Sequence, residues 1–333
     1  MRIRILFGVV LVLSVAWSVY WFVGSSAMER GANQWFADQA AAGLVAEHGD
    51  LSVAGYPSRF DLTVNDLYLA DPLTGYAWTA PFVQILTLSY KPWHLIAALP
   101  NDQSFQTPLQ KLTLASAKLQ ASLVVQPSNK LALDRTRIVG DSLTLSSDLG
   151  WSIGAKTLRF ATDSLTPDAL QHEVGLELLQ ITPDAALSAL LPELPTEIER
   201  ARLDAKLTLT APPDQQANET RPQVQTIEVK DLALVWGPIQ LSGKGTVTAD
   251  AMGQAEGRVD LRLTNWRKAL PLAVATGLMR PEVQQTWENM LAALASESGN
   301  PDDLDMPLSF QRGRMMLGPL PLGSAPVLIA QRQ

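Results

Sequence analysis

The chain opens with a long apolar run whose pattern differs from that of every later segment. From Ile5 to Val23 the sequence carries no charged residue, and aromatic side chains gather toward the end of the run: Trp17, Tyr20, Trp21 and Phe22. About 20 apolar helical residues, each rising about 1.5 Å, match the roughly 30 Å hydrocarbon core of a bilayer. Residues 1–26 are therefore predicted to form a transmembrane anchor, with its late aromatic rings in the headgroup layer.

The residues that flank this run predict its orientation. Arg2 and Arg4 precede it and no basic cluster follows directly, which places the N-terminus in the cytoplasm and the body of the protein outside. A cleaved signal peptide is the alternative, because Ser25 and Ala27 are small residues of the kind that signal peptidase requires. The run is longer than a usual apolar core of about 7–15 residues in a signal peptide, which favours a retained anchor.

A second helix is predicted directly after the anchor. Apolar residues recur at helical spacing in this Ala-rich stretch, among them Trp35, Phe36 and Leu44. Residues 27–48 are expected to form a stem helix that lays its apolar stripe on the following domain, and Gly49 is the expected stop.

From Asp50 onward the apolar period changes to two, which is typical of strands. Phe60, Leu62 and Val64 alternate with polar residues, and Leu67 resumes the alternation one step out of phase, which predicts a β-bulge around Asn65-Asp66. Further strand-like runs, separated in many places by turn-forming residues, are 82–90, 111–115, 118–125, 143–145, 151–160 and 173–181.

Two later runs alternate most cleanly and define the candidate ligand-binding face. Their apolar members are Leu203, Leu207, Leu209, Val259, Leu261 and Leu263, and their polar members include Asp204, Lys206, Asp260, Arg262 and Thr264. Such alternation means that one face of the sheet is dry and the other is wet, as in an antiparallel sheet. The predicted fold is mainly β: a large antiparallel curved sheet, or a two-lobed sandwich, with a few covering helices.

Three helical segments are expected among the strands, and one loop is expected to divide them. The helices are 183–191, with Thr182 as N-cap, 266–278 and 281–296. The polar, Pro-containing segment 211–221 is the expected linker between a β-rich lobe at 49–211 and a second lobe at 222–333, which holds the helices near 266–296. The pattern V-x-D-L-x-L occurs at Val64 and again at Val229, which suggests duplicated strand units.

Composition excludes several classes of function. The net charge of −7 argues against nucleic acid as a partner. The chain contains no cysteine, so disulfides, thiol catalysis and thiolate metal sites are excluded. Only His48, His94 and His172 supply imidazoles, and they lie far apart in the sequence. No cofactor or metal is expected.

The motifs that carry chemistry elsewhere are weak here. Gly243-Lys244-Gly245-Thr246 lacks the earlier glycine of a phosphate loop and is interpreted as a hairpin turn. Asp302, Asp303 and Asp305 are interpreted as a solvated loop rather than a cation site. His94 is interpreted as a half-buried neighbour of Trp93. Asp61 and Asp66 are assigned to the sheet edge and turn rather than to acid–base catalysis.

Motifs near both ends of the body resemble those of a known family. Gly55-Tyr56-Pro57-Ser58-Arg59-Phe60-Asp61-Leu62 and Leu317-Gly318-Pro319-Leu320-Pro321-Leu322-Gly323 resemble the G-[YF]-P-x-R-F-D-L opening and LGP-x-P-x-G ending of an alphaproteobacterial membrane-anchored family of unknown function. The glycine pattern from Gly237 to Trp266 is similar to strand pairs of AsmA-like envelope proteins. The resemblance implies a single-pass inner-membrane protein whose β-rich body lies in the periplasm.

Three functions remain open at this stage. The resemblance to AsmA-like proteins, whose curved sheets hold acyl chains, implies a non-enzymatic protein that binds or conveys lipid for envelope homeostasis. An assembly partner that binds other envelope proteins through sheet edges is the second hypothesis. An unrecognised hydrolase is the third. The expected partners are accordingly lipid of the inner membrane, phospholipid included, or other envelope proteins.

Overall fold

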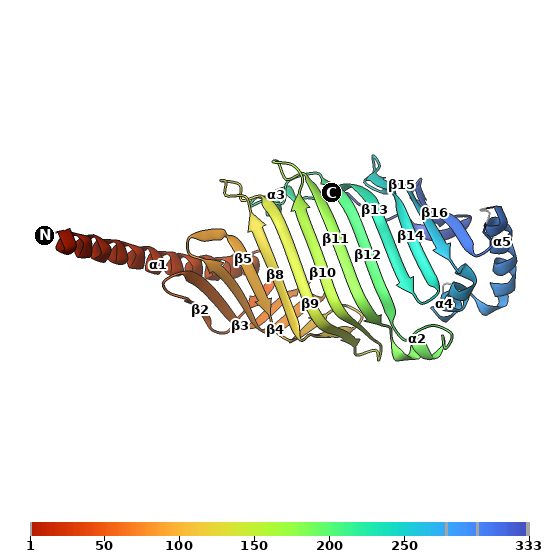
Figure 1. Cartoon of the computed structure of the whole chain (residues 1–333), viewed down its shortest axis with the longest axis horizontal. Coiled ribbons are helices and arrows are strands. Elements are labelled where there is room, and N and C mark those ends of the chain that lie inside the picture. Colours follow the sequence, from red (N-terminus) through yellow and green to blue (C-terminus); the bar gives the residue numbers. More distant parts are fainter. Residues whose placement is uncertain (1, 277–278, 298–299, 331–333) are drawn as a thin grey trace. The chain divides into compact units, whose positions relative to one another are not determined.

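A computed structural model of the chain describes residues 2–276, 279–297 and 300–330 (Figure 1). Two compact units are present. Unit 1 comprises Met1–Val125 and Leu145–Gly150, and unit 2 comprises Gln126–Thr144 and Trp151–Gln333. The described residues contain 18 strands, and every described strand pair is antiparallel, which confirms the predicted mainly β class.

The first helix is longer than the predicted anchor and shorter than anchor and stem together. α1 runs without interruption from Arg2 to Ala41, about 60 Å at 1.5 Å per residue. It ends in a Schellman motif: Leu44 N donates to Gln39 O, Gly43 N donates to Ala40 O, and Gly43 has φ +91°. The predicted stop at Gly49 is therefore wrong, and Val45–Glu47 forms strand β1 rather than the last turn of a helix.

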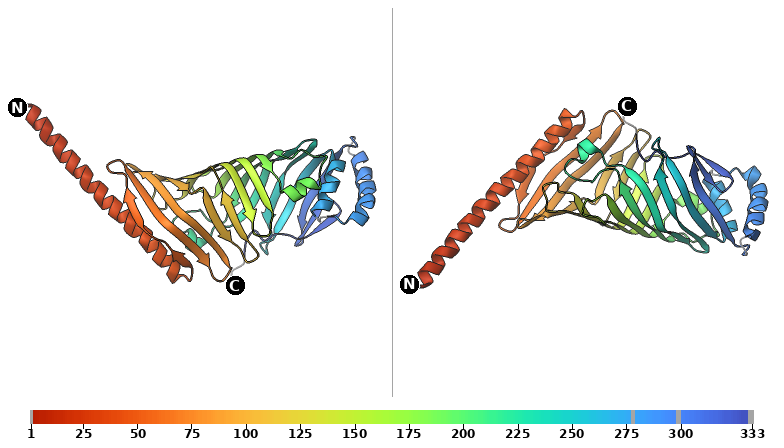
Figure 2. Two further views of the ribbon diagram at one scale, coloured as in Figure 1. Left: turned by 90° about the horizontal axis from the view of Figure 1, so that it is seen from below. Right: turned by 90° about the horizontal axis from the view of Figure 1, so that it is seen from above.

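The two halves of α1 have different surroundings. Side chains from Ile5 to Val15 are mostly exposed, and the helix is long and apolar enough to cross a membrane. In the second half, Met28, Ala32 and Phe36 pack on the buried cluster of unit 1 formed by Leu62, Val64, Leu67 and Ala80. The predicted apolar stripe of the stem is thus present, and it covers the sheet of unit 1 (Figure 2).

Unit 1 is built around a long hairpin whose second strand pairs with two partners. β3 (Arg59–Asp71) pairs with β4 (Tyr76–Leu88), and β1 and β2 (Leu51–Ala54) lie along β3. One half of β4 pairs with β5 (Lys91–Leu99) and the other half with β6 (Asp102–Gln106). β5 also pairs with β8 (Lys118–Val125), and β6 also pairs with β7 (Lys111–Ala115).

The predicted phase slip in the first long strand is confirmed, but it is not a β-bulge in the β3–β4 ladder, whose register is continuous from Asn65↔Phe82 to Leu67↔Ala80. Asp66 has φ +49°, and the buried positions of β3 move from Val64 to Leu67, a step of three rather than two. The second V-x-D-L-x-L segment also carries an irregularity, because the register between β13 and β14 shifts between Val229 and Leu232. The shared pattern therefore marks two strands that each change phase at the same point of the motif.

Unit 2 is an antiparallel meander in which each strand pairs with the next along the chain (Figures 1 and 2). Its strands are β9 (Leu133–Ser147, which continues into unit 1), β10 (Ser152–Ser164), β11 (Gln171–Thr182), β12 (Ile198–Leu209), β13 (Val224–Trp236), β14 (Ile239–Ala249), β15 (Ala255–Thr264), β16 (Asp303–Gln311), β17 (Arg314–Leu317) and β18 (Leu320–Ser324).

Short helices cover one end of this meander. α2 (Ala185–Ala189) is capped by Asp184, whose carboxylate accepts from Ala186 N, so the predicted Thr182 cap is wrong. The predicted helices at 266–278 and 281–296 correspond to η1 (Trp266–Ala269), α4 (Leu270–Ala275), η2 (Pro281–Val283) and α5 (Gln284–Glu297); residues 277–278 lie outside the described residues. Trp266, 1% exposed, anchors them with Leu291 and Leu304.

The segment expected to separate two lobes lies inside unit 2. Residues 211–221 contain the short helix α3 (Ala217–Thr220) and join β12 to β13. These two strands pair along most of their length, from Arg200↔Val235 to Leu209↔Val224. The division between the compact units falls instead at Val125 and within β9.

Glycines in the middle of two strands allow close backbone approach. A Cβ on Gly245 would lie 2.2 Å from the carbonyl oxygen of Arg258, and one on Gly257 would lie 2.2 Å from that of Thr246. The interpretation of Gly243–Thr246 as a hairpin turn is therefore wrong: these residues are inside β14, and at position 245 only glycine fits against the backbone of β15.

A pair of Gly→Ala substitutions tests this packing. Gly245→Ala should destabilise unit 2 by about 1–3 kcal/mol, because backbone atoms must move to admit the methyl group. Gly31→Ala is the control: nothing lies within 4 Å of its added Cβ in helix α1, so we expect no loss of stability. Thermal unfolding of the full chain in detergent, followed by circular dichroism, compares the two. Equal melting temperatures would contradict the close approach.

Candidate functional site: a half-covered apolar patch in unit 2

The strand register of unit 2 aligns apolar side chains in rows on one face of the sheet. Leu203 lies opposite Leu176 on one side and Leu232 on the other, and Leu207 lies opposite His172 and Ile227. On β14 and β15 the first row continues through Gly243 and Leu261. The predicted dry face is therefore a continuous surface that crosses several strands.

The six predicted residues fall into two groups on this face. Val259, Leu261 and Leu263 belong to, or pack against, buried clusters. Leu203, Leu207 and Leu209 are half-buried, and they pack against none of the buried clusters found among the described residues. Sequence periodicity identified the face but not which part of it is covered.

We call the less covered part the apolar patch, formed by Leu176, Leu203, Leu207, Ile227 and Leu232 on β11, β12 and β13. Each of these side chains is half-buried. Leu176, Ile227 and Leu232 were not singled out from the sequence, because their places opposite Leu203 and Leu207 depend on a register that includes a shift between Asp204 and Ala205.

Other segments of unit 2 cover the apolar side chains on either side of the patch. On one side, Trp236 and Ile239 pack with Leu191, Leu194 and residues of α4. On another, the C-terminal segment adds Ala325 and Leu328 to the cluster around Val259 and Phe310. Pro326 O accepts from Ala255 N, and Gly253 O accepts from Leu328 N, both at 2.8 Å, which fixes that segment in place. The apolar patch thus lies between two covered regions.

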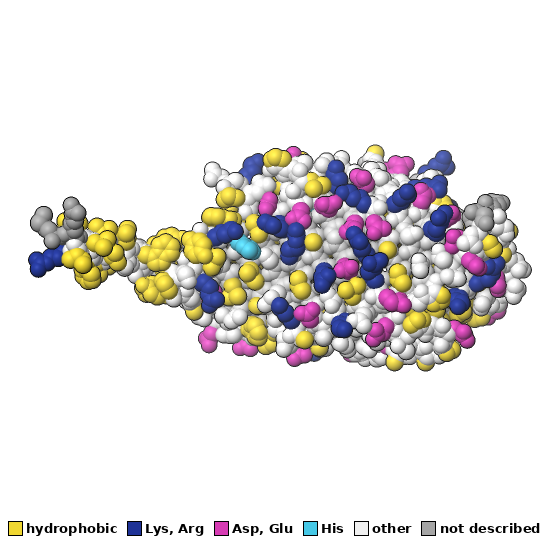
Figure 3. Space-filling model, in the orientation of Figure 1, with side chains coloured by type: hydrophobic (Ala, Val, Ile, Leu, Met, Phe, Trp, Pro, Cys, Tyr) yellow, Lys and Arg dark blue, Asp and Glu magenta, His cyan; other side chains and the backbone are white. Residues whose placement is uncertain are grey.

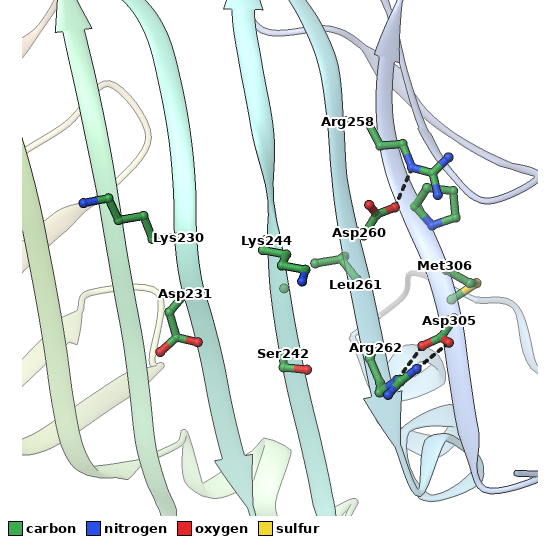
Figure 4. A pocket seen from close by; sticks show the side chains of 12 residues that line it. Lys230, Asp231, Ser242, Lys244, Arg258, Asp260, Leu261, Arg262, Asp305 and Met306 are labelled. Atoms are coloured by element: carbon green, nitrogen blue, oxygen red, sulfur yellow. Dashed lines mark hydrogen bonds and ion pairs between the residues drawn. The ribbon is translucent and has the colours of Figure 1, made fainter. Parts of the chain in front are cut away.

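The opposite face of the same strands is polar and charged. Figure 3 shows basic and acidic side chains interspersed over the strands of unit 2. Arg262 donates two hydrogen bonds to Asp305 at 2.7 and 2.8 Å, and Arg258 donates to Asp260 at 2.5 Å (Figure 4). Lys230 donates to Glu173 at 2.7 Å. These pairs keep this face hydrated, so the sheet has one wet side and one apolar side.

A shallow hollow of about 560 Å³ lies on this charged surface. Four basic and three acidic side chains line it: Lys230, Lys244, Arg258 and Arg262, with Asp231, Asp260 and Asp305. The hydrogen bond from Arg262 lowers the pKa of Asp305, and the bond to Glu173 raises the pKa of Lys230. Because the opposite charges nearly balance and most of them are paired, the hollow has no strong preference for an anion or a cation.

The prediction of a solvated loop for the acidic cluster near the C-terminus holds for Asp302, which is exposed in a turn, and is wrong for Asp303 and Asp305. Asp303 and Asp305 lie on β16; Asp303 accepts from Thr264 Oγ1 at 2.9 Å, and Asp305 is paired with Arg262. Among the described residues, no group of three or more His, Asp or Glu side chains is arranged to hold a metal ion.

The three histidines lie in different local environments. His94 is half-buried, as predicted, and its Nε2 lies 2.9 Å from Ser122 Oγ. His48 contacts Phe36 with the two rings tilted by 50° and their centroids 4.3 Å apart. His172 is 4% exposed beside Leu207 and donates from Nε2 to Ala169 O, while no hydrogen-bond partner of its Nδ1 is present among the described residues. Of the two carboxylates considered for acid–base work, Asp61 is paired with Arg59 at 2.7 Å.

Unit 1 contains a separate apolar hollow of about 380 Å³ that sequence reasoning missed. It lies where the end of α1 meets β3, β4 and β6, and aromatic residues dominate its lining: Trp35, Tyr76, Trp78 and Phe105. The rings of Trp78 and Phe105 are stacked, with centroids 6.3 Å apart. Phe105 belongs to β6, whose five residues show too little alternation to be recognised as a strand.

Together these features define a class: a mainly β protein with one apolar N-terminal helix long enough to span a membrane and a sheet that is wet on one face and apolar on the other. The chain belongs to the family described as "Uncharacterized protein conserved in bacteria (DUF2125)", which it matches over residues 21–326. Neither the curated proteins nor the solved structures gave a match.

The charged face yields a pH-dependent prediction. Because the folded-state pKa of Asp305 is lowered by Arg262, the pair stabilises the fold above the unfolded-state pKa of about 3.9, and this contribution disappears as the pH falls through the folded value. Both side chains are about half exposed, so Asp305→Asn should cost no more than about 1 kcal/mol at pH 7. Urea unfolding at pH 7 and pH 3 measures the difference between the wild type and the variant. A difference of equal size at both pH values would contradict this assignment.

Proposed function

We propose that this chain is a non-enzymatic inner-membrane protein whose body lies in the periplasm and binds lipid acyl chains for envelope homeostasis. The observation that carries the proposal is the apolar patch, a set of aligned leucine and isoleucine side chains left half-buried between two covered regions of one sheet. None of these side chains is fully exposed, but each keeps part of its apolar surface accessible and belongs to none of the buried clusters among the described residues, so an apolar ligand would complete their cover.

The N-terminal helix supports the membrane part of the proposal. Most of its apolar run is exposed, but Trp21 near the end of the run is 5% exposed and donates from Nε1 to Arg59 O at 2.6 Å. Cleavage between Ala27 and Met28 would remove this contact from unit 1, which favours a retained anchor over a signal peptide. Arg2 and Arg4 favour a cytoplasmic N-terminus and a periplasmic body.

The polar chemistry favours binding over catalysis. His94 and His48 are engaged with neighbouring groups in unit 1, and His172 is buried in unit 2 among apolar side chains. The charged hollow gathers lysine, arginine and aspartate in near balance and has no histidine in its lining. We therefore propose no reaction for this protein.

Assembly with other envelope proteins through strand addition is the second hypothesis. The last strand of the chain, β18, is only five residues long and contains Pro321, which has no N–H to donate to an added strand. This feature disfavours strand addition there, whereas the apolar patch offers aligned aliphatic side chains on three adjacent strands, which suit an acyl chain. Lipid is therefore the occupant that we propose.

Two aspartate substitutions on the apolar face, and one on the charged face, test the proposal. Leu207→Asp places a carboxylate in the half-covered patch and should leave the protein folded but lower the fraction with co-purified lipid at least about tenfold. Leu261→Asp should instead unfold unit 2, because Leu261 packs against a buried cluster. Ser242→Asp, at an exposed position on β14, is the matched control and should change neither property.

Native mass spectrometry of the detergent-purified full chain, with circular dichroism for folding, reads out both properties. A Leu207→Asp variant that unfolds would mean that the patch is closed core. A folded Leu207→Asp variant that keeps its lipid, or a wild type that carries none, would contradict acyl-chain binding on this face.

A further inference from the structure

Two turns of unit 1 lie against α1 at the end of its apolar run. We call residues 55–58, between β2 and β3, and residues 89–90, between β4 and β5, the collar turns. Trp17 Nε1 donates to Pro57 O at 2.9 Å, Tyr20 OH donates to Ser89 O at 2.5 Å, and the hydroxyls of Ser18 and Tyr56 are 2.8 Å apart. The opening motif around Gly55-Tyr56-Pro57 therefore docks on the helix.

These contacts fix the depth of the collar turns relative to the helix. Ser18 lies five residues before Val23, the last residue of the uncharged run, which is about 7.5 Å along the axis. If the run spans the hydrocarbon core, Tyr56 reaches the outer edge of that core rather than the water above it. Trp17 and Tyr20, which also bind the turns, are residue types that favour the membrane interface.

The backbone of the collar turns suits this depth. A polar backbone group in lipid needs a partner inside the protein, because no water is present to replace it. The donors of Trp17, Tyr20 and Trp21 satisfy the carbonyl oxygens of Pro57, Ser89 and Arg59. Within the turns, Ser89 N donates to Ser58 O and Arg59 N donates to Gly55 O, both at 2.9 Å.

Both tyrosines of the collar turns point outward, beside the exposed Pro57 and Ser58. Tyr56 is 54% exposed and Tyr90 is 60% exposed, and Phe22 on the helix, 60% exposed, stacks on Tyr56 with centroids 5.8 Å apart. Lys91 follows Tyr90 directly and is exposed, so its ammonium group can reach lipid phosphates. Tyrosine rings with a neighbouring lysine match the chemistry of a phospholipid headgroup layer.

We propose that the collar turns are seated in the headgroup layer of the bilayer that α1 crosses, so that unit 1 rests on the membrane surface through Tyr56 and Tyr90. This inference depends on the anchor in the proposed function and not on lipid binding by the apolar patch. It assigns a physical role to the Gly-Tyr-Pro motif: the turn closes on the helix, and the tyrosine faces lipid.

Because the chain has no cysteine, single-cysteine variants report depth at one position each. Tyr90→Cys, Leu73→Cys and Val12→Cys are labelled with the fluorophore NBD and reconstituted as full chains in phosphatidylethanolamine–phosphatidylglycerol vesicles. Leu73 is the matched control: it is an apolar residue, 95% exposed, at the opposite end of the β3–β4 hairpin, about 40 Å from Tyr90 along the strands. Val12 lies in the middle of the apolar run.

Quenching by lipids that carry a nitroxide near the headgroup or deep in the acyl chain separates the outcomes. We expect the Tyr90 label to be quenched most by the shallow nitroxide, the Val12 label most by the deep one, and the Leu73 label by neither. A Tyr90 label that behaves like the Leu73 label, while Val12 is quenched, would overturn the membrane seat and leave the anchor intact. Absence of quenching at Val12 would overturn both.

Discussion

The constraint on which this structure depends is that a sheet with one dry face must have that face covered. In unit 1 the second half of α1 provides the cover, with Phe36 at its centre. In unit 2 the segments around Trp266 cover one region and the C-terminal segment covers another. The apolar patch between them, around Leu203 and Leu207, is what these segments leave half-buried, and the proposed function follows from that remaining surface.

The two faces of the unit 2 sheet contribute differently to the stability of the fold. Paired charges such as Arg262 and Asp305 keep the charged face hydrophilic. They stabilise the fold only slightly, because both side chains are about half exposed. Most stabilisation must therefore come from the inner face, where Gly245 and Gly257 let β14 and β15 approach closely. An acyl chain on the apolar patch would add apolar contact to that face without disturbing the outer one.

Much of this architecture was predictable from local patterns. The period of two along Leu203–Leu209 and Val259–Leu263 predicted strands with a dry face, and the phase slip at Asp66 predicted an irregular strand. The rest depended on long-range contacts. From the sequence, Gly43 and Gly49 are equally good candidates to end α1, and only the hydrogen bonds at its C-terminus identify Gly43. Gly243 and Gly245 likewise resemble turn residues until their pairing with β15 is known. Which leucines stay only half-buried depends on the helices and the C-terminal segment, whose positions no local pattern specifies.

Photocrosslinking in living cells tests the occupant of the apolar patch most directly. Benzoylphenylalanine replaces Leu203 on the patch, and in a control chain it replaces Thr246, which is exposed on the charged face of β14. After irradiation, the account predicts that the chain labelled at position 203 carries the added mass of a phospholipid and that the chain labelled at position 246 does not. A polypeptide adduct at position 203, or the same lipid adduct at both positions, would contradict the assignment of this face to acyl chains.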